Sequence, residues 1–256
     1  MIEITQNGAI GTIRLNRPEV RNALTGEMLR DLAAGVMNFD ADPEVRVIIL
    51  TGADPAFCAG LDLRDLANIY NGAIVKPAPG QTTRGLMPAS STPIIGVVNG
   101  PAVTGGLELA LGCDFLIASR EHATFADTHA RVGIMPAGGM TIRLPQLVGV
   151  NRARQMSLTG DFISATTACD WGLVNEVCAH EVLLARAQVL AQSIADCDPL
   201  AVSKIRSMYE ELAHRSDAEA YREEAKISRE WMKERFNPSV FEESRSGIIK
   251  RGSAQQ

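Results

Sequence analysis

The sequence predicts an α/β protein in which buried parallel strands alternate with helices. Two continuous apolar runs, "VRVIILTG" (residues 45–52) and "TPIIGVVNG" (residues 92–100), are rich in β-branched residues, as strands buried on both faces are. Each run is followed by a Gly-containing turn and a helical pattern. Parallel strands need such crossover helices, so the order strand, helix, strand, helix predicts an α/β core.

The remaining elements of the first half follow from local signals. "IEIT" and "AIGTIRLN" flank Asn7-Gly8, a dipeptide that favours a tight turn, so residues 2–16 predict a hairpin. Thr25 can cap a helix that runs to about Ala41, because apolar residues recur along one side of that stretch. "FLIAS" (115–119) and "ATFA" (123–126) predict short strands.

The chain becomes mostly helical after Gly149. Asp198-Pro199 and Asn237-Pro238 are helix-start signals, and the heavily charged final helices predict solvated faces. We therefore expect an α/β core over residues 1–195 and a helical region over 196–256. Residues 68–91 have no period and are rich in Pro, Gly, Ser and Thr, which indicates an irregular surface segment. Helices are predicted over residues 152–158, 165–171, 182–195, 199–214 and 217–236.

Composition limits the partners of the 256-residue chain. A formal net charge of -5 argues against a nucleic-acid surface, because phosphate binding needs a basic face. The five cysteines form no C-x-x-C pair and lack a nearby histidine, so we expect reduced thiols and no metal site. No apolar run approaches the roughly 20 residues of a membrane helix, and the N-terminus has no secretory pattern. We expect a cytoplasmic protein without a membrane partner.

The first stretch that could carry chemistry is "AFCAGLDL" (residues 56–63). Gly60 can bring its backbone close to a ligand, and a helix predicted to begin near Asp62 would leave the amide of Leu61 free. Free amides at a helix start can hold an oxyanion. The alternative is an ordinary strand-to-helix turn in which Asp62 is the cap.

The second stretch is "GPAVTGGLELALGCD" (residues 100–114). Gly105 and Gly106 begin a helix directly after a strand, and Glu108 lies in its first turn among apolar neighbours. One interpretation is a carboxylate that only complements the helix dipole. The other is a carboxylate on the wall of an apolar pocket, with its pKa raised by desolvation. Neither phosphate-binding glycine motif of nucleotide enzymes is present.

The third stretch is "TFADTHARVGIMPAGG" (residues 124–139). Asp127, His129 and Arg131 precede a run of glycines and a proline. Histidine titrates near neutral pH and can move protons, although a single histidine is more often structural.

These stretches together, in this order, resemble the crotonase superfamily, which contains the enoyl-CoA hydratases and isomerases. The blocks F-C-A-G-x-D (57–62), G-G-x-E-L-A (105–110) and L-T-G-x-x-I-S-A-x-x-A (158–168) carry the likeness, which covers nearly the whole chain. The resemblance implies an α/β, crotonase-like (ClpP/crotonase) spiral of β-β-α units with a C-terminal helical region. It also implies a homotrimer, or a dimer of trimers, assembled through residues 196–256.

Proteins of this superfamily bind acyl-CoA thioesters, so the resemblance implies a coenzyme A thioester as substrate and no other cofactor. By position, the amides of Leu61 and Gly105 would hold the thioester oxygen as it becomes an enolate. Glu108 matches the first of two glutamates that typical hydratases use on water. The second glutamate is absent, and His129 stands in its place.

The resemblance also indicates the path of the substrate. Arg21, Arg64 and Lys250 are candidates for the CoA phosphates, although the ending "SRSGIIKRGSAQQ" lacks the usual aromatic residue after Gly247. Residues 68–91 stand where the family's variable acyl-pocket segment lies. The predicted substrate-binding residues are Ala23, Leu24, Ala59, Gly60, Asp62, Leu63, Val103, Gly106 and Thr128.

Three activities remain open at this point. The first is hydration of a 2-enoyl-CoA by Glu108 with help from His129 or a water. The second is another reaction through the same enolate, such as double-bond isomerisation or thioester hydrolysis. The third is acyl-CoA binding with little or no turnover. The residue at position 129 leaves the choice open, because a second glutamate would have favoured hydration and histidine does not.

Overall fold

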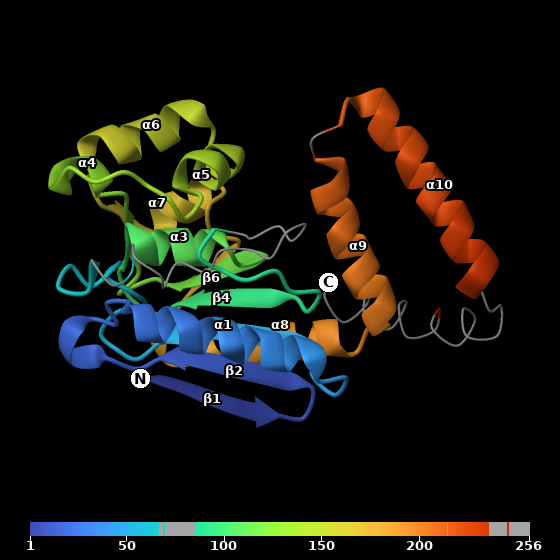
Figure 1. The fold of residues 1–256 in the computed structure, drawn as a ribbon, viewed down its shortest axis with the longest axis horizontal. Helices are drawn as coiled ribbons and strands as arrows, with labels where there is room; N and C mark the ends of the chain where they lie inside the picture. Colours follow the sequence, from blue (N-terminus) through green and yellow to red (C-terminus); the bar gives the residue numbers. More distant parts are fainter. Residues whose placement is uncertain (67–68, 70–84, 214, 236–244, 246–256) are drawn as a thin grey trace. The chain divides into compact units, whose positions relative to one another are not determined.

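The computed structural model describes residues 1–66, 69, 85–213, 215–235 and 245 (Figure 1). The chain divides into two compact units, Met1–Ser203 and Lys204–Gln256. The first unit contains all the strands named below and the candidate site.

The main element of the first unit is a six-stranded sheet. Its strands lie in the order β1-β2-β3-β4-β6-β9, with β1 antiparallel to β2 and every other neighbouring pair parallel. The predicted hairpin and the predicted buried strands are therefore confirmed. The strands are β1 (Ile2–Asn7), β2 (Ile10–Leu15), β3 (Val47–Gly52), β4 (Ile94–Val98), β6 (Phe115–Ser119) and β9 (Glu176–Cys178).

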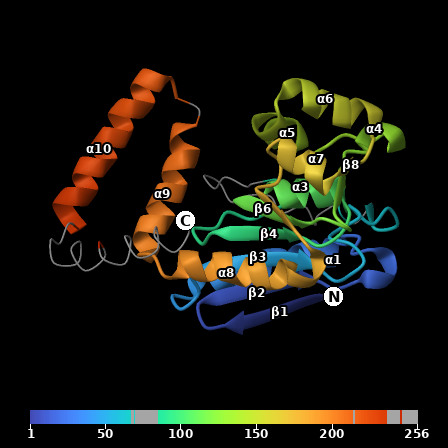
Figure 2. The ribbon, with the colours of Figure 1, turned by 180° about the vertical axis from the view of Figure 1, so that it is seen from behind.

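Helices cover both faces of this sheet, which explains why β3 and β4 are apolar throughout. On one face, the small residues Ala187 and Ala191 of α8 (Leu183–Ala195) pack on Ile49 and its neighbours (Figure 2). On the other face, residues of α1 (Gly26–Ala41) and α3 (Gly105–Leu111) share a core with Ile48 and Leu50. Thr25 caps α1 by accepting a hydrogen bond from the Met28 amide, as its sequence predicts.

A second, three-stranded sheet positions the candidate site. Strand β5 (Ala102–Val103) pairs in parallel with β7 (Thr124–Ala126), which pairs antiparallel with β8 (Ile163–Ser164). Helix α3 follows β5 directly, and the short helix α4 (His129–Val132) follows β7. Because β5 and β7 are parallel neighbours, the starts of α3 and α4, and thus Glu108 and His129, are brought to the same place.

The remaining helices agree largely with the sequence patterns. The predicted helices appear as α6 (Val150–Thr159), α7 (Ala165–Asp170), α8, α9 (Pro199–Leu212) and α10 (Asp217–Arg235). Two further helices, α4 and α5 (Met140–Val148), were not predicted, since α4 is a single turn and α5 contains Pro145. The described chain also contains two short 3-10 helices, η1 (Pro18–Val20) and η3 (His180–Val182).

One prediction near the site needs correction. Residues 63–65 form a turn, and helical structure begins at Leu66, so the helix does not start at Asp62. The reason is that Asp62 is engaged otherwise. Its amide donates to the Leu24 carbonyl, and its side chain accepts hydrogen bonds from the Arg64 amide and the Arg17 guanidinium. Most of the segment 68–91, predicted to be irregular, lies outside the described residues, as does Lys250.

Candidate active site

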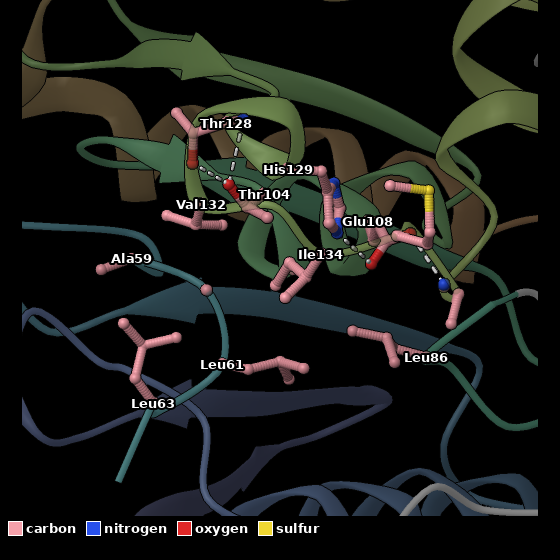
Figure 3. A pocket seen from close by; sticks show the side chains of 15 residues that line it. Ala59, Leu61, Leu63, Leu86, Thr104, Glu108, Thr128, His129, Val132 and Ile134 are labelled. Carbon is pink, nitrogen blue, oxygen red and sulfur yellow. Dashed lines mark hydrogen bonds and ion pairs between the residues drawn. The ribbon is translucent and has the colours of Figure 1, made fainter. Parts of the chain in front are cut away.

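A cavity lies where the loop after β3, the start of α3, helix α4 and the loop before α5 meet. Figure 3 shows Leu61, Leu63 and Leu86 across this cavity from a group that contains Thr104, Thr128 and Glu108. The wall consists of Ala59, Gly60, Leu61, Leu63, Leu86, Thr104, Gly105, Glu108, Thr128, His129, Val132, Ile134, Met135, Ala137 and Gly138.

Two backbone amides open on this cavity side by side. A methyl group placed on Gly105 would lie 3.3 Å from the amide nitrogen of Leu61, and one placed on Gly60 would lie 3.5 Å from the amide nitrogen of Gly105. Neither the Leu61 amide nor the Gly105 amide donates to an acceptor within the described ranges. Two unpaired donors this close together can hold a single oxygen atom that carries negative charge.

The Leu61 amide is kept open by the neighbouring backbone. Gly60 has a φ of 104°, in the region that favours glycine, and its carbonyl accepts the Leu24 amide while the Asp62 amide donates back to Leu24. These two hydrogen bonds form an isolated parallel β-bridge between Leu24 and Leu61. The bridge uses the Gly60 carbonyl and the Asp62 amide, so the N–H of Leu61 itself points away from Leu24. The free amide therefore results from the turn at Gly60 and the bridge to Leu24, and not from a helix start.

The Gly105 amide is positioned by a strained residue before it. Thr104 has a φ of 54° and a ψ of -111°, which is costly for a β-branched residue. Three contacts hold it there. Its amide donates to the Ala126 carbonyl, its hydroxyl pairs with the hydroxyl of Thr128, and the same hydroxyl oxygen accepts the Thr128 amide. Strand β7 and Thr128, the residue directly before α4, thus fix the orientation of the Gly105 amide at the start of α3.

Glu108 is a buried carboxylate with one oxygen fixed and one directed at a histidine. Its side chain is 3% exposed, and its Oε1 accepts the amides of Gly138 at 2.7 Å and Met140 at 3.4 Å. Burial raises the pKa of Glu108, and the Gly138 hydrogen bond and the charge of His129 offset only part of this rise. Gly138 must be glycine, because a methyl group there would lie 2.7 Å from Oε2.

His129 lies between two carboxylates. Its Nε2 is 3.9 Å from Oε2 of Glu108, and its Nδ1 is 2.6 Å from Oδ1 of Asp127. Burial opposes ionisation of Asp127, but hydrogen bonds from the His129 ring, the Ser157 hydroxyl and the His129 amide lower the pKa of this carboxyl below its ordinary value. The site therefore contains an ionised aspartate, an imidazole and a glutamate in line.

The structure brings together eight of the predicted site residues in the wall of the cavity: Ala59, Gly60, Leu61, Leu63, Gly105, Glu108, Thr128 and His129. Other predicted residues lie outside that wall. Leu24 is fully buried in the core, Asp62 pairs with Arg17, and the Cα of Gly106 packs against the Cys58 carbonyl. Ala23 and Val103 are half-buried, and Arg21 and Arg64 are exposed.

Sequence reasoning missed three contributors to the site. Thr104 was read only as part of a glycine-rich turn, and Asp127 only as a neighbour of His129. Gly138 belongs to a glycine pair that was noted without a role. The spacing D-x-H could have indicated the Asp127–His129 pair, but the bond from Gly138 to Glu108 spans 30 residues and has no local signal.

Neither a metal site nor a membrane-spanning helix is found among the residues that the structure describes. None of their His, Cys, Asp and Glu side chains gather in threes as a metal site would need. None of their helices is both long and apolar enough to cross a bilayer.

Comparisons with known proteins agree with this fold and site. A family model described as enoyl-CoA hydratase/isomerase matches residues 5–248. The chain is similar to the crystal structure of enoyl-CoA hydratase from Mycobacterium tuberculosis, with 45% identity and a TM-score of 0.75 over 91% of this chain and 99% of that one. The chain therefore belongs to the enoyl-CoA hydratase/isomerase family and has the crotonase fold, as predicted.

Curated relatives show that the family contains more than one activity. The chain is 39% identical over 203 residues to "Probable enoyl-CoA hydratase 1, peroxisomal" of Arabidopsis thaliana, covering 79% of this chain and 76% of the relative. It is 35% identical over 224 residues to carnitinyl-CoA dehydratase of Shigella flexneri, covering 86% and 84%. These similarities support an enzyme of the crotonase family and leave its particular reaction to be argued.

Proposed function

We propose that this protein is an enoyl-CoA hydratase, which adds water across the double bond of a 2-enoyl-CoA thioester and catalyses the reverse reaction. The observation that carries the proposal is the pair of unpaired amides at Leu61 and Gly105, on the same cavity wall as the buried Glu108. An oxygen acceptor site beside a carboxylate of raised pKa suits chemistry that passes through a thioester enolate.

The proposed reaction assigns one task to each group. The amides of Leu61 and Gly105 bind the thioester oxygen. Glu108 removes a proton from water as the water oxygen bonds to the β-carbon, and the electrons of the double bond move onto the thioester oxygen. His129 then gives its Nε2 proton to the α-carbon as the enolate collapses, so its ring must enter the reaction with protons on both nitrogens. Nε2 of His129 lies 3.9 Å from Oε2 of Glu108, too far for a direct hydrogen bond. The proton taken from water therefore passes from Glu108 to Nε2 through one bridging water, which restores both groups before the next turnover.

Double-bond isomerisation through the same enolate is the second candidate. It is favoured by a specific observation, the imidazole of His129 in place of a second glutamate, because one ring nitrogen can move a proton between two carbons. Similarity to the carnitinyl-CoA dehydratases is consistent with the reverse, dehydrating direction of the hydratase reaction. Thioester hydrolysis and binding without turnover are the remaining outcomes of the test below.

The deciding experiment is a panel of 2-enoyl-CoA thioesters of several chain lengths, followed by loss of the conjugated enoyl-thioester absorbance. Mass spectrometry of the products separates hydration, which adds one water to the thioester, from isomerisation, which leaves its mass unchanged, and from hydrolysis, which frees coenzyme A. We expect turnover by the wild-type protein and a loss of about 10³-fold or more in Glu108→Gln. Acyl-CoA binding should persist in this variant, because the amides that hold the oxygen are unchanged. Turnover that Glu108→Gln leaves intact, or acyl-CoA binding by the wild type without any turnover, would contradict the proposal.

Unfolding measurements control for damage to the fold. Because burial raises the pKa of Glu108, ionisation costs the folded state free energy, and stability falls as pH rises from the ordinary glutamate value to the raised one. Glutamine carries no charge and can still accept the Gly138 amide. Glu108→Gln should therefore be at least as stable as the wild type at neutral pH.

We also propose the assembly and location that the family likeness implies. The second unit exposes large apolar and aromatic side chains, among them Tyr209 at 78% and Tyr221 at 74%, which favours burial against other copies. Light scattering should give the mass of three or six copies of the chain. The mass of a monomer would contradict the proposed assembly. The cytoplasmic location stays a prediction.

A further inference from the structure

Asp127 is a buried charge to which the proposed reaction assigns no task. It lies at the end of β7, two residues before His129, and is 1% exposed. Its Oδ1 is 2.6 Å from Nδ1 of His129 and accepts the His129 amide at 3.2 Å. A third donor, the hydroxyl of Ser157 on α6, also bonds to this carboxylate. Burying an ion is costly, so its partners must compensate for the loss of water.

These contacts decide which nitrogen of the ring carries a proton. A carboxylate can only accept, so Nδ1 of His129 must be the N–H donor toward Asp127. In the neutral ring, Nε2 then has a free lone pair. This nitrogen lies on the side of Glu108, at 3.9 Å from Oε2, and His129 is part of the cavity wall.

We propose that Asp127 is a positioning residue, which holds His129 in its Nδ1–H form with Nε2 directed into the cavity as the proton-carrying atom. The catalytic consequence rests on the proposed function, while the tautomer does not. The charged groups paired with the ring in the described part of the chain are Asp127 at the end of β7 and Glu108 on α3. Asp127 offers its oxygen to Nδ1 at 2.6 Å, and Oε2 of Glu108 lies 3.9 Å from Nε2.

A merely structural role for Asp127 is the alternative. Oδ1 also accepts the amide of His129, the first residue of α4, and could simply fix the turn between β7 and this helix. The two roles differ in one respect. Asparagine at this position can keep the turn through its oxygen, but this neutral oxygen is a weaker acceptor than a carboxylate oxygen and favours a proton on Nδ1 less strongly. The substitution Asp127→Asn therefore separates the two roles.

The first measurement uses ¹⁵N spectroscopy of the histidine rings in the whole protein without substrate, with His129 assigned from the missing signals of His129→Gln. The comparison is made at a pH high enough for the ring to be neutral. There we expect the Nδ1–H form in the wild type and a mixed or reversed tautomer in Asp127→Asn. An Nε2–H ring in the wild type, or the same tautomer in both proteins, overturns the proposal. Since no turnover is involved, this result holds even if the hydratase proposal fails.

The second measurement is a double-mutant cycle on turnover of the enoyl-CoA that the wild type uses best. We expect Asp127→Asn to lower kcat about 10²-fold with KM changed by less than about threefold, since the ring still stands in place but in the wrong form. In the His129→Gln background the same substitution should change kcat by less than about twofold, because Asp127 acts through the ring. A full loss in that background overturns the proposal.

Asp40→Asn is the matched control. Asp40 is another aspartate that accepts several hydrogen bonds, from the Ser91 and Thr92 amides and from neighbouring hydroxyls, and it plays no part in the cavity wall. We expect this variant to lose stability while kcat and the His129 tautomer stay as in the wild type. If Asp40→Asn lowered kcat as much as Asp127→Asn, the effect of Asp127 would be one of general stability and the proposal would be wrong.

Discussion

The two sides of the cavity differ in the kind of group they present, since one offers backbone amides and the other offers side chains. On one side, the Leu61 and Gly105 amides are backbone groups, held by the bridge at Leu24 and the strained Thr104. On the other side, Glu108 and His129 are side chains whose identity alone defines the chemistry. Backbone amides keep their positions when side chains change, so long as the glycines remain. A catalytic side chain, in contrast, is lost or replaced by a single substitution. A change of reaction would therefore need a substitution only on the side-chain side of the cavity.

The backbone side can be broken by filling the space between its amides. In Gly105→Ala, the new methyl group would lie 3.3 Å from the Leu61 amide nitrogen, in the place proposed for the thioester oxygen. We expect kcat/KM to fall about 10²- to 10³-fold, which is the usual effect of losing one such donor. Steady-state kinetics and thermal unfolding of the same protein sample measure the two effects separately.

The neighbouring glycine provides the contrast. A methyl group on Gly106 would lie 2.1 Å from the Cys58 carbonyl oxygen, which is deep in the fold and cannot give way cheaply. Gly106→Ala should therefore lower the unfolding temperature strongly, while Gly105→Ala, whose closest contacts are 3.3 Å, should change it much less. If both variants lost stability equally, Gly105 would be a packing residue and the proposed oxygen site would lose its support.

The role of the side chains can be tested by the pH dependence of kcat/KM. Glu108 must be ionised to act as a base, and burial raises its pKa, so the acid limb of kcat/KM should lie above the ordinary glutamate value of about 4.3. Activity should fall about tenfold for each pH unit below that limb. The charge of His129 lowers the pKa of Glu108, so His129→Gln should move the limb to higher pH. A limb at the ordinary value would remove Glu108 as the base.

The smallest expected effect lies at the link between the two sides. Thr128 joins β7 to Thr104 through their hydroxyls, and Thr104 sets the amide of Gly105. Thr128→Val keeps the shape but leaves the Thr104 hydroxyl without this partner. We expect a loss of about 1 kcal/mol in the free energy of unfolding and a fall of about two- to fivefold in kcat. A rate equal to the wild type would show that Thr104 holds its conformation without this contact.

Much of the fold could be predicted because its signals are local. Asn7-Gly8 favours a turn whatever surrounds it, and Thr25 caps the helix that follows it. Short apolar runs with β-branched residues, such as residues 47–50, favour buried strands. The start of the helix after Asp62 was misplaced because Arg17 and Leu24, distant in sequence, engage Asp62. Local propensity cannot account for such partners.

The sequence by itself determined the order of the main strands and helices, the likeness to a family, and the positions of Glu108 and His129 within its motifs. Only the tertiary structure decided how these residues work together. The parallel pairing of β5 and β7 sets α3 beside α4, and this places Nε2 of His129 3.9 Å from Glu108. Burial then raises the pKa of one carboxyl, and three donors lower the pKa of the other, Asp127. A pKa depends on which groups surround a charge in space, and the order of residues along the chain does not specify those neighbours.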